Sequence, residues 1–164
     1  MPRMIIARAA LLTFTLSGCF GAQTFAGQPH VAENPEAFVG RVVGNGHCVK
    51  FVQAAAAVPI TSEWRPGAWV RGNNSIPPGT AIATFERDGT YTSERGNHAA
   101  IYISQDETGI RVYDQWVGKP VHERVIRFKG GRGAGSGYKS NDGTLYRVVL
   151  SGPVTEEVAD NEPE

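Results

Sequence analysis

The sequence predicts an α+β domain in which an early helix that carries a cysteine packs on an antiparallel β-sheet. Three observations support this fold class. The chain has 164 residues, the size of one domain. Its 20 glycines and 10 prolines favour many short elements and turns over a few long helices. One convincing helical segment is followed by several strand-like runs, and a hydrophobic content of 41% is enough for a packed core, which excludes wholesale disorder.

Residues 1–26 have the three-part pattern of a secretory signal peptide: a basic start, an apolar run too short to span a bilayer, and small residues. Two cleavage sites compete. Small residues up to Ala26 fit cleavage before Gly27. Residues 16–19 are similar to the bacterial lipobox, whose cysteine, here Cys19, is lipidated and becomes the new N-terminus. Either site predicts a domain over residues 27–153 in the periplasm or outside the cell, and cleavage at Cys19 would make it a lipoprotein with a lipid anchor, on the outer membrane for example.

The first half of the mature chain predicts one main helix among turns. A cap residue followed by a proline predicts a short helix over residues 34–38. A glycine-punctuated turn over residues 42–48 then leads into a helix over residues 49–57, which Pro59 ends. Three residues at helical spacing form its apolar face: Val49, Val52 and Ala56. Residues 61–69, rich in turn formers, are predicted to be a loop.

The second half predicts the sheet. Strands are expected over residues 81–85, 97–104, 109–116, 121–128 and 145–150. A hairpin-type turn is predicted at residues 87–90, and a short turn at residues 105–108 makes the strands on either side of it an antiparallel pair. A glycine-rich loop is expected over residues 130–137 and an acidic, frayed tail over residues 154–164.

The charge balance excludes a protein that binds the phosphate backbone of nucleic acids. The chain has 16 basic and 16 acidic residues; both basic residues of the leader, Arg3 and Arg8, are removed with it, so the mature chain has fourteen against sixteen, a net charge of −2. Nucleic-acid binding requires a basic stripe. The paired cysteine and histidine spacings of zinc sites are lacking, as is the Lys-Ser/Thr ending of a phosphate-binding loop, so neither a metal nor a cofactor is expected.

Cys48 is the candidate nucleophile, because it is the one cysteine outside the predicted leader. It stands where the glycine-punctuated turn enters the helix. Unpaired N–H groups and the helix dipole at that position favour a thiolate and lower the pKa of the thiol.

His98 is the candidate base. It opens the strand at residues 97–104 among small residues, so its ring can lie beside a helix N-terminus packed on the sheet and take the proton of the thiol. A base of this kind needs a third group that fixes its tautomer. The predicted strand pair brings Asp114 or Gln115 next to His98, and strand alternation lets only one of them point toward it. We prefer Asp114, because a carboxylate also stabilises the imidazolium.

The order of these residues resembles the papain-like bacterial cell-wall amidases, which include the CHAP domains, the NlpC-type peptidases and the amidase effectors delivered by type VI secretion. The resemblance is carried by residues 44–49, 96–102 and 112–116 and spans residues 31–128. Members often place glutamine directly before the nucleophile, where this chain has His47. The backbone N–H of Cys48 could supply one contact to an oxyanion.

The resemblance implies a papain-like fold and cleavage of an amide in the peptide stems of peptidoglycan. Cys48 would attack the carbonyl, His98 would protonate the leaving amine, and Asp114 would orient His98. Two alternatives stay open: a cysteine hydrolase of another amide, and a catalytically silent periplasmic lipoprotein that binds cell wall or a partner protein. The presence of Cys48, His98 and Asp114 together argues against the silent protein. The leader favours a resident envelope enzyme over a type VI effector, and an immunity-type inhibitor is expected as a partner only of a toxin. Trp64, Trp69 and Trp116 could line the substrate groove, but large aromatic residues are more often in the core, so they are not counted as site residues.

Overall fold

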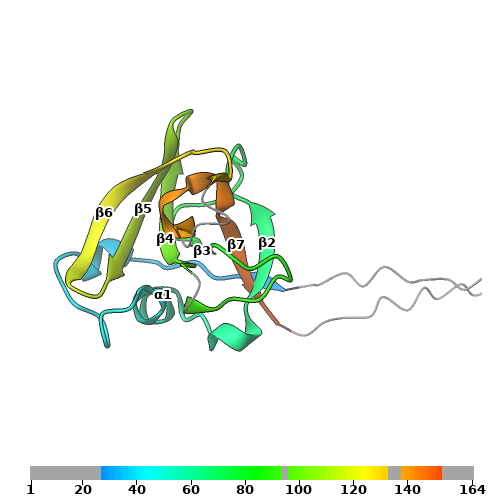
Figure 1. Ribbon diagram of the computed structural model, residues 1–164. Coiled ribbons are helices and arrows are strands. Elements are labelled where there is room, and N and C mark those ends of the chain that lie inside the picture. Colours follow the sequence, from blue (N-terminus) through cyan, green and yellow to red (C-terminus); the bar gives the residue numbers. More distant parts are fainter. Residues whose placement is uncertain (1–26, 94–95, 133–137, 153–164) are drawn as a thin grey trace, which may run out of the picture.

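The computed structural model describes residues 27–93, 96–132 and 138–152. It has the predicted α+β architecture, with one α-helix packed against an antiparallel sheet (Figure 1). The predicted leader, the end of the glycine-rich loop and the predicted acidic tail lie outside the described residues. Among the described residues, no helix has the length and apolar character needed to span a bilayer.

Seven strands of the described chain form one sheet, in the order β1-β7-β3-β4-β5-β6, with β2 paired to β7. All of these strand pairs are antiparallel. The strands are β1 Gln28–Pro29, β2 Arg65–Trp69, β3 Ala81–Ala83, β4 Ala99–Gln105, β5 Gly109–Trp116, β6 Lys119–Arg127 and β7 Arg147–Ser151. The predicted pair at residues 97–116 is confirmed as the hairpin of β4 and β5, and β6 follows β5 as the last strand of the sheet.

The helix α1, Cys48–Ala56, begins at the cysteine itself, one residue earlier than predicted. Its buried face also differs from the expectation: Phe51 is fully buried beside Val52, whereas Val49 is only half-buried. The helix ends where Ala57 takes a left-handed conformation (φ +51°), two residues before Pro59. Short 3-10 helices complete the described elements: Pro35–Phe38 (η1), Thr61–Glu63 (η2), Lys139–Asn141 (η5) and Gly143–Leu145 (η6).

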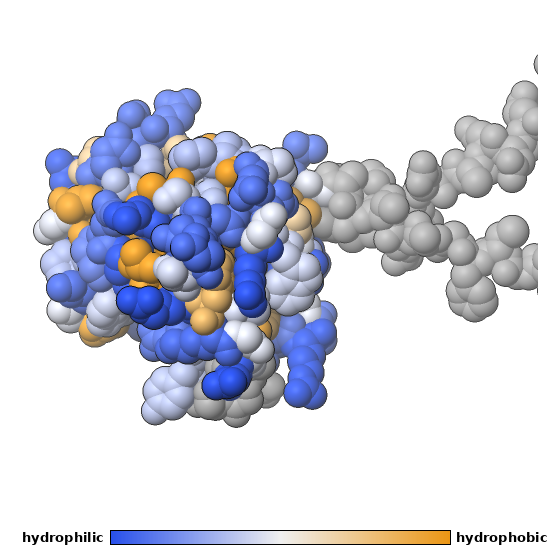
Figure 2. All heavy atoms as spheres, turned by 90° about the horizontal axis from the view of Figure 1, so that it is seen from above, coloured by the Kyte–Doolittle hydropathy of each residue, from blue (hydrophilic) through white to orange (hydrophobic). Residues whose placement is uncertain are grey.

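Hydrophobic residues cover both faces of the sheet. On one face, Phe51 and Val52 of α1 pack with Trp64 and with inward residues of the central strands. On the other face, Val70 and Ile76 of the segment after β2 pack with Tyr146 and with the alternate residues of the same strands. Figure 2 shows a face on which hydrophilic residues predominate and hydrophobic residues lie in small separate patches. Both faces of the sheet are therefore covered by packed side chains. A functional site is to be sought at the end of the sheet, where several strands begin or end.

Two predictions for the chain between α1 and β4 are wrong. Residues 61–69 are not a loop throughout, because Arg65–Trp69 forms strand β2 on the edge of the sheet. Pro66, which has no backbone N–H to donate, is tolerated in an edge strand. The turn at residues 87–90 forms, with the Glu86 N–H donating to Thr90 O at 2.9 Å. It does not join two strands, since the next strand begins only at Ala99.

Candidate active site

Cys48 is the first residue of α1, and a tight turn delivers the chain to it. Gly44 (φ +57°) and Gly46 (φ +83°) both take the left-handed conformation that glycine adopts without strain. A Cβ atom at position 44 would lie 2.9 Å from Lys50 Cβ, so the turn also needs the small residue for space. His47 precedes the helix with an extended backbone and makes no side-chain cap. The thiol of Cys48 therefore lies at the N-terminus of the helix, as predicted.

The side chain of Gln115 holds this turn against the sheet. Its Oε1 accepts from the Val43 N–H at 2.9 Å, and its Nε2 donates to Val43 O and His47 O, each at 2.9 Å. Gln115 is fully buried. It thus binds both ends of the turn that leads to Cys48, and it points to the α1 side of β5.

Asp114, the neighbour of Gln115 on β5, contacts His98. His98 Nε2 lies 2.8 Å from Asp114 Oδ2, and both side chains are buried. This contact leaves His98 Nδ1 for the side of Cys48. The backbone N–H of His98 donates to Thr84 Oγ1 at 3.0 Å, which fixes the start of β4. Of the two residues weighed from the sequence, Asp114 is thus the one that reaches His98, and Gln115 serves the opposite face of the strand.

Arg124 of β6 is a second partner of Asp114 that the sequence did not single out. Its Nε donates to Asp114 Oδ2 at 2.7 Å, and its Nη1 donates to Asn141 Oδ1 at 3.1 Å. The other oxygen, Asp114 Oδ1, makes no hydrogen bond with any described residue, and His122 Nδ1 lies 3.8 Å from it. Burial opposes the charge of Asp114, but the contacts with His98 and Arg124 outweigh it and lower the pKa of this carboxyl. Asp114 is therefore held as a carboxylate.

His98 and Cys48 shift each other toward the charged forms. Burial alone would lower the pKa of His98, but Asp114 and the neighbouring Cys48 thiol raise it to about 9. Burial opposes ionisation of Cys48 too, but its interaction with His98 lowers the pKa of the thiol below the ordinary value. The arrangement favours a thiolate beside an imidazolium, which is the form of a cysteine nucleophile that is ready to react.

Tyr91 contributes a further polar atom, with its hydroxyl 3.6 Å from Cys48 Sγ. Burial, together with the charge of Cys48, raises the pKa of Tyr91, so the hydroxyl stays protonated and able to donate. Tyr91 packs at 4.8 Å between ring centroids on the fully buried Trp64. No sequence pattern marked this residue, because it comes from an irregular segment before β4.

A hollow of about 260 Å³ lies beside His98, which forms part of its wall. Its wall includes Trp116 and Arg124 and two residues of η5, Ser140 and Asn141. Trp116 is 42% exposed and Trp69 is 53% exposed, so only Trp64 of the three tryptophans is in the core, and the expectation of burial is wrong for the other two.

Arg124 could have been found from the pairing of β5 with β6. In this register Asp114 pairs with His122, which places Arg124, two residues further along β6, near Asp114.

The remaining histidines lie apart from the thiol. His47 is exposed, and His30 Nε2 lies 2.6 Å from Ser151 Oγ at the β1–β7 edge. Within the described ranges, no group of three or more histidine, cysteine or acidic side chains could hold a metal ion.

Comparison with known families supports an amidase. A family model described as domesticated amidase effector 2 matches residues 22–149. The chain is 40% identical over 126 residues to a type VI secretion amidase effector 2 protein of Salmonella typhi, covering 73% of this chain and 91% of the relative. It is also 40% identical over 104 residues to domesticated amidase effector 2 of Ixodes scapularis, covering 58% of this chain and 70% of that relative.

The fold has a solved counterpart. The structure of a type 6 secretion amidase effector 2 (Tae2) superposes with a TM-score of 0.66 at 37% sequence identity, covering 76% of this chain and 96% of the other. The predicted papain-like α+β fold is therefore confirmed.

Proposed function

Because the chain belongs to the domesticated amidase effector 2 family of papain-like peptidoglycan amidases, we propose that it hydrolyses amide bonds in peptidoglycan stem peptides through Cys48, His98 and Asp114. One observation carries the assignment of these residues. The buried His98 ring is bound to the Asp114 carboxylate at 2.8 Å on one side and interacts with the Cys48 thiol on the other. The proposed nucleophile, base and orienting acid thus interact pairwise, with His98 between the other two.

In the proposed reaction, the Cys48 thiolate attacks the carbonyl carbon of the scissile amide and forms a C–S bond. The imidazolium of His98 then gives its proton to the leaving amine as the C–N bond breaks. A water molecule, deprotonated by His98, attacks the resulting thioester and releases the acid, which returns the thiol. Asp114 keeps the imidazole in one orientation and stabilises its positive charge, and Arg124 keeps Asp114 ionised.

The oxyanion formed in each step needs hydrogen-bond donors. The backbone N–H of Cys48 lies in the first turn of α1, where the helix has no internal acceptor for it. The Tyr91 hydroxyl, close to the sulfur, is the second donor that we propose. This pair would replace the glutamine that related amidases often place before the cysteine, since the His47 side chain is exposed and makes no capping bond.

We also propose that residues 1–26 are the secretory leader of this enzyme, which would carry it to the periplasm or the outside of the cell, where peptidoglycan is found. Lipidation of Cys19 would tether it to the outer membrane. The leader favours a resident enzyme that trims the cell's own wall. In the alternative role of a toxin, an immunity-type inhibitor would be its partner.

Digestion of purified peptidoglycan tests the proposed activity. The mature chain from Gly27 should release new muropeptides, identified by mass spectrometry, and Cys48→Ala should lower their rate of release by at least about 10³-fold. His98→Ala should lower it similarly, whereas the matched control His47→Ala should stay close to wild type, because the His47 side chain touches neither Cys48 nor Asp114 in the described contacts. Sacculi left intact by the wild type under reducing conditions would contradict the proposal.

A further inference from the structure

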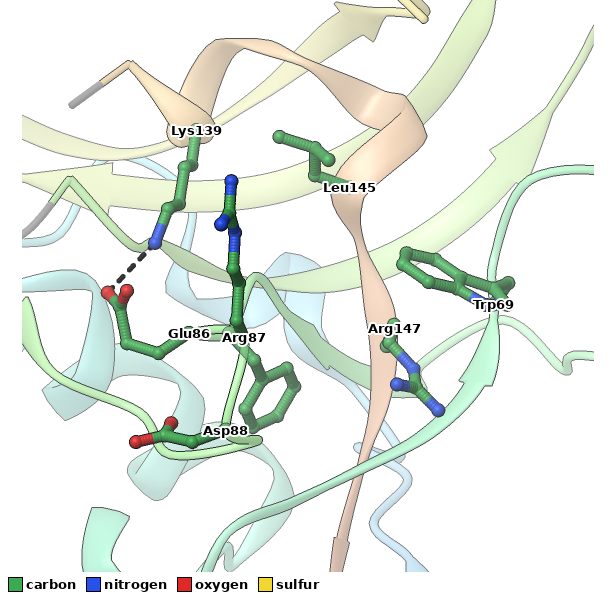
Figure 3. Close-up of a pocket in the computed structure, with 8 residues that line it drawn as sticks. Trp69, Glu86, Arg87, Asp88, Lys139, Leu145 and Arg147 are labelled. Atoms are coloured by element: carbon green, nitrogen blue, oxygen red, sulfur yellow. Dashed lines mark hydrogen bonds and ion pairs between the residues drawn. The ribbon is translucent and has the colours of Figure 1, made fainter. Parts of the chain in front are cut away.

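A second hollow, of about 570 Å³, opens between the end of β3, the short helix η5 and the start of β7 (Figure 3). We call it the arginine pocket, after Arg87 and Arg147 in its wall. Trp69, Phe85, Glu86 and Lys139 also line it. The proposed reaction makes no use of these residues.

The two arginines are the cationic groups of this pocket that remain open to a ligand. Lys139 Nζ is already paired with Glu86 Oε1 at 2.8 Å. Asp88 is engaged in its own turn, where Oδ1 accepts from the N–H and the hydroxyl of Thr90 at 3.0 and 2.7 Å. No described residue forms an ion pair with Arg87 or Arg147. The charges in the pocket are therefore arranged for an anion.

Arg147 is held in place before any ligand arrives. Its Nε donates to Gly67 O at 2.7 Å, and its guanidinium lies over the Trp69 ring at 4.8 Å from the centroid. Both contacts leave the two terminal nitrogens of the guanidinium available. Arg87 is exposed, and its side chain extends into the pocket between Lys139 and Leu145 (Figure 3). In Figure 3 the guanidinium groups of Arg87 and Arg147 point toward different ends of the pocket, so each suits a carboxylate of its own, which the planar fork of arginine binds with two parallel hydrogen bonds.

The wall of the pocket is connected to the reacting groups through two intermediate residues, Tyr91 and Asn97. Phe85 meets Tyr91 edge to face at 6.2 Å between centroids, and the Tyr91 hydroxyl lies 3.6 Å from Cys48 Sγ. Glu86 Oε1 accepts from Asn97 Nδ2 at 2.7 Å, and Asn97 precedes His98 in the chain. The arginine pocket and the hollow over His98 are separated by η5, which contributes Lys139 to the first and Ser140 and Asn141 to the second.

We propose that the arginine pocket binds carboxylates of the stem peptide through Arg87 and Arg147, and so places the scissile amide of the peptide near Cys48. The inference rests on the proposed function, because a stem peptide ends in a carboxylate and carries further carboxylates on its side chains. The pocket would then determine specificity: it would select peptides with a free carboxylate at a set distance from the scissile amide.

Two substrates and one exposed arginine test this. The wild type is compared on a stem peptide with free carboxylates and on the same peptide with its carboxylates converted into carboxamides. We expect the wild type to cleave the carboxamide with a kcat/KM lower by about 10- to 100-fold, the range for losing charge-assisted hydrogen bonds. Arg87→Gln should lose a similar factor on the free peptide, and it should discriminate much less between the two substrates.

The matched control is Arg127→Gln, which removes an exposed charge at the far end of β6, where Arg127 pairs with Gly109. This variant should keep both the activity and the discrimination of the wild type. The proposed carboxylate binding would be overturned if the wild type cleaved both peptides equally, or if Arg87→Gln discriminated between them as the wild type does. Either result would leave the proposed amidase activity intact. A wild type that cuts no peptidoglycan would instead overturn the proposed function, and the carboxylate site with it.

Discussion

His98 has the most constrained environment of the described ionisable side chains in the site. It is buried, its Nε2 is bound to a carboxylate that Arg124 also holds, and it interacts with the Cys48 thiol. A buried histidine without partners would be neutral at physiological pH. Here Asp114 and Cys48 raise the pKa of His98 to about 9, so the imidazolium that the proposed reaction uses as proton donor exists before the substrate binds.

These shifts predict a bell-shaped dependence of kcat/KM on pH. The acid limb follows deprotonation of Cys48, whose pKa lies below its ordinary value, and the alkaline limb follows loss of the His98 proton at about pH 9. In Asp114→Asn the main contact that raises the His98 pKa is lost. The alkaline limb should therefore move to lower pH, and kcat should fall by roughly 10²- to 10⁴-fold.

Initial rates on muropeptides between pH 5 and pH 10 measure both effects. Asp106→Asn is the control, because Asp106 accepts hydrogen bonds in the β4–β5 turn at the other end of the strands. Its alkaline limb should stay at about pH 9. An Asp114→Asn enzyme whose alkaline limb did not move would contradict the assigned partner of His98.

At the scale of elements, the β4–β5 hairpin explains why the contact between His98 and Asp114 could be predicted from the sequence. Strand alternation and a four-residue turn predicted that one of two adjacent residues on β5 would meet His98, and Asp114 is the one that does. Sequence alone could not assign a task to the other residue. Gln115 acts on the turn before Cys48, and the three hydrogen bonds that show this join positions 72 and 68 residues apart.

We predict that Gln115 positions the nucleophile rather than supporting His98. Gln115→Leu leaves two carbonyls and one N–H without their partner, so the free energy of unfolding should fall by about 2 kcal/mol or more. The turn before Cys48 should loosen, and both kcat and the rate of thiol alkylation should drop. The alkaline limb of the pH profile should remain at about pH 9, because His98 and Asp114 keep their contact.

Gln105 provides a matched control for this variant. It also makes three hydrogen bonds to one loop, accepting from the Gly72 N–H and donating to Val70 O and Asn73 O, but it does so at the other end of β4. Gln105→Leu should lower thermal stability without slowing alkylation of Cys48. If both variants reacted with the alkylating reagent at the wild-type rate, Gln115 would be a structural residue only.

Elements that depend on distant partners escaped the sequence analysis. Strand β2 contains Pro66 and Gly67, both poor strand residues, and it forms because β7 offers an edge to pair with. Arg124 occupies an ordinary alternating position, and its role follows from the register between β5 and β6. Tyr91 lies in an irregular segment, and the arginine pocket combines such a segment, residues 85–88, with residues of β2, η5 and β7 that no periodicity in the sequence brings together.

At the scale of the whole molecule, the fold class was predictable because one helix and a series of alternating strands are local patterns. The packing of both sheet faces was not, since each strand is short and its apolar residues divide between two cores. The arginine pocket and the hollow over His98 are each lined by residues from segments far apart in the sequence, so only the folded chain defines them.

The leader gives a prediction for the complete chain in a bacterial host. We expect cleavage at Cys19, with a lipid on that residue and the enzyme in the membrane fraction; Cys19→Ala should release a soluble chain that begins at Gly27. Fractionation and mass spectrometry of the mature N-terminus measure this, and Cys48→Ala should be processed as the wild type is. A wild-type enzyme found soluble and unmodified from Gly27 would assign the other cleavage site.

Strand β5 also limits how the length of this chain can vary. Asp114 contacts His98 and Gln115 contacts the turn before Cys48, so these adjacent residues make contacts on opposite faces of one strand. Deleting or inserting a single residue inside Gly109–Trp116 would exchange the two sides for every residue beyond it. Both contacts would be lost at once, and apolar side chains would turn outward. Insertions and deletions are therefore tolerable in the connecting turns, whereas the length of β5 has to be inherited unchanged.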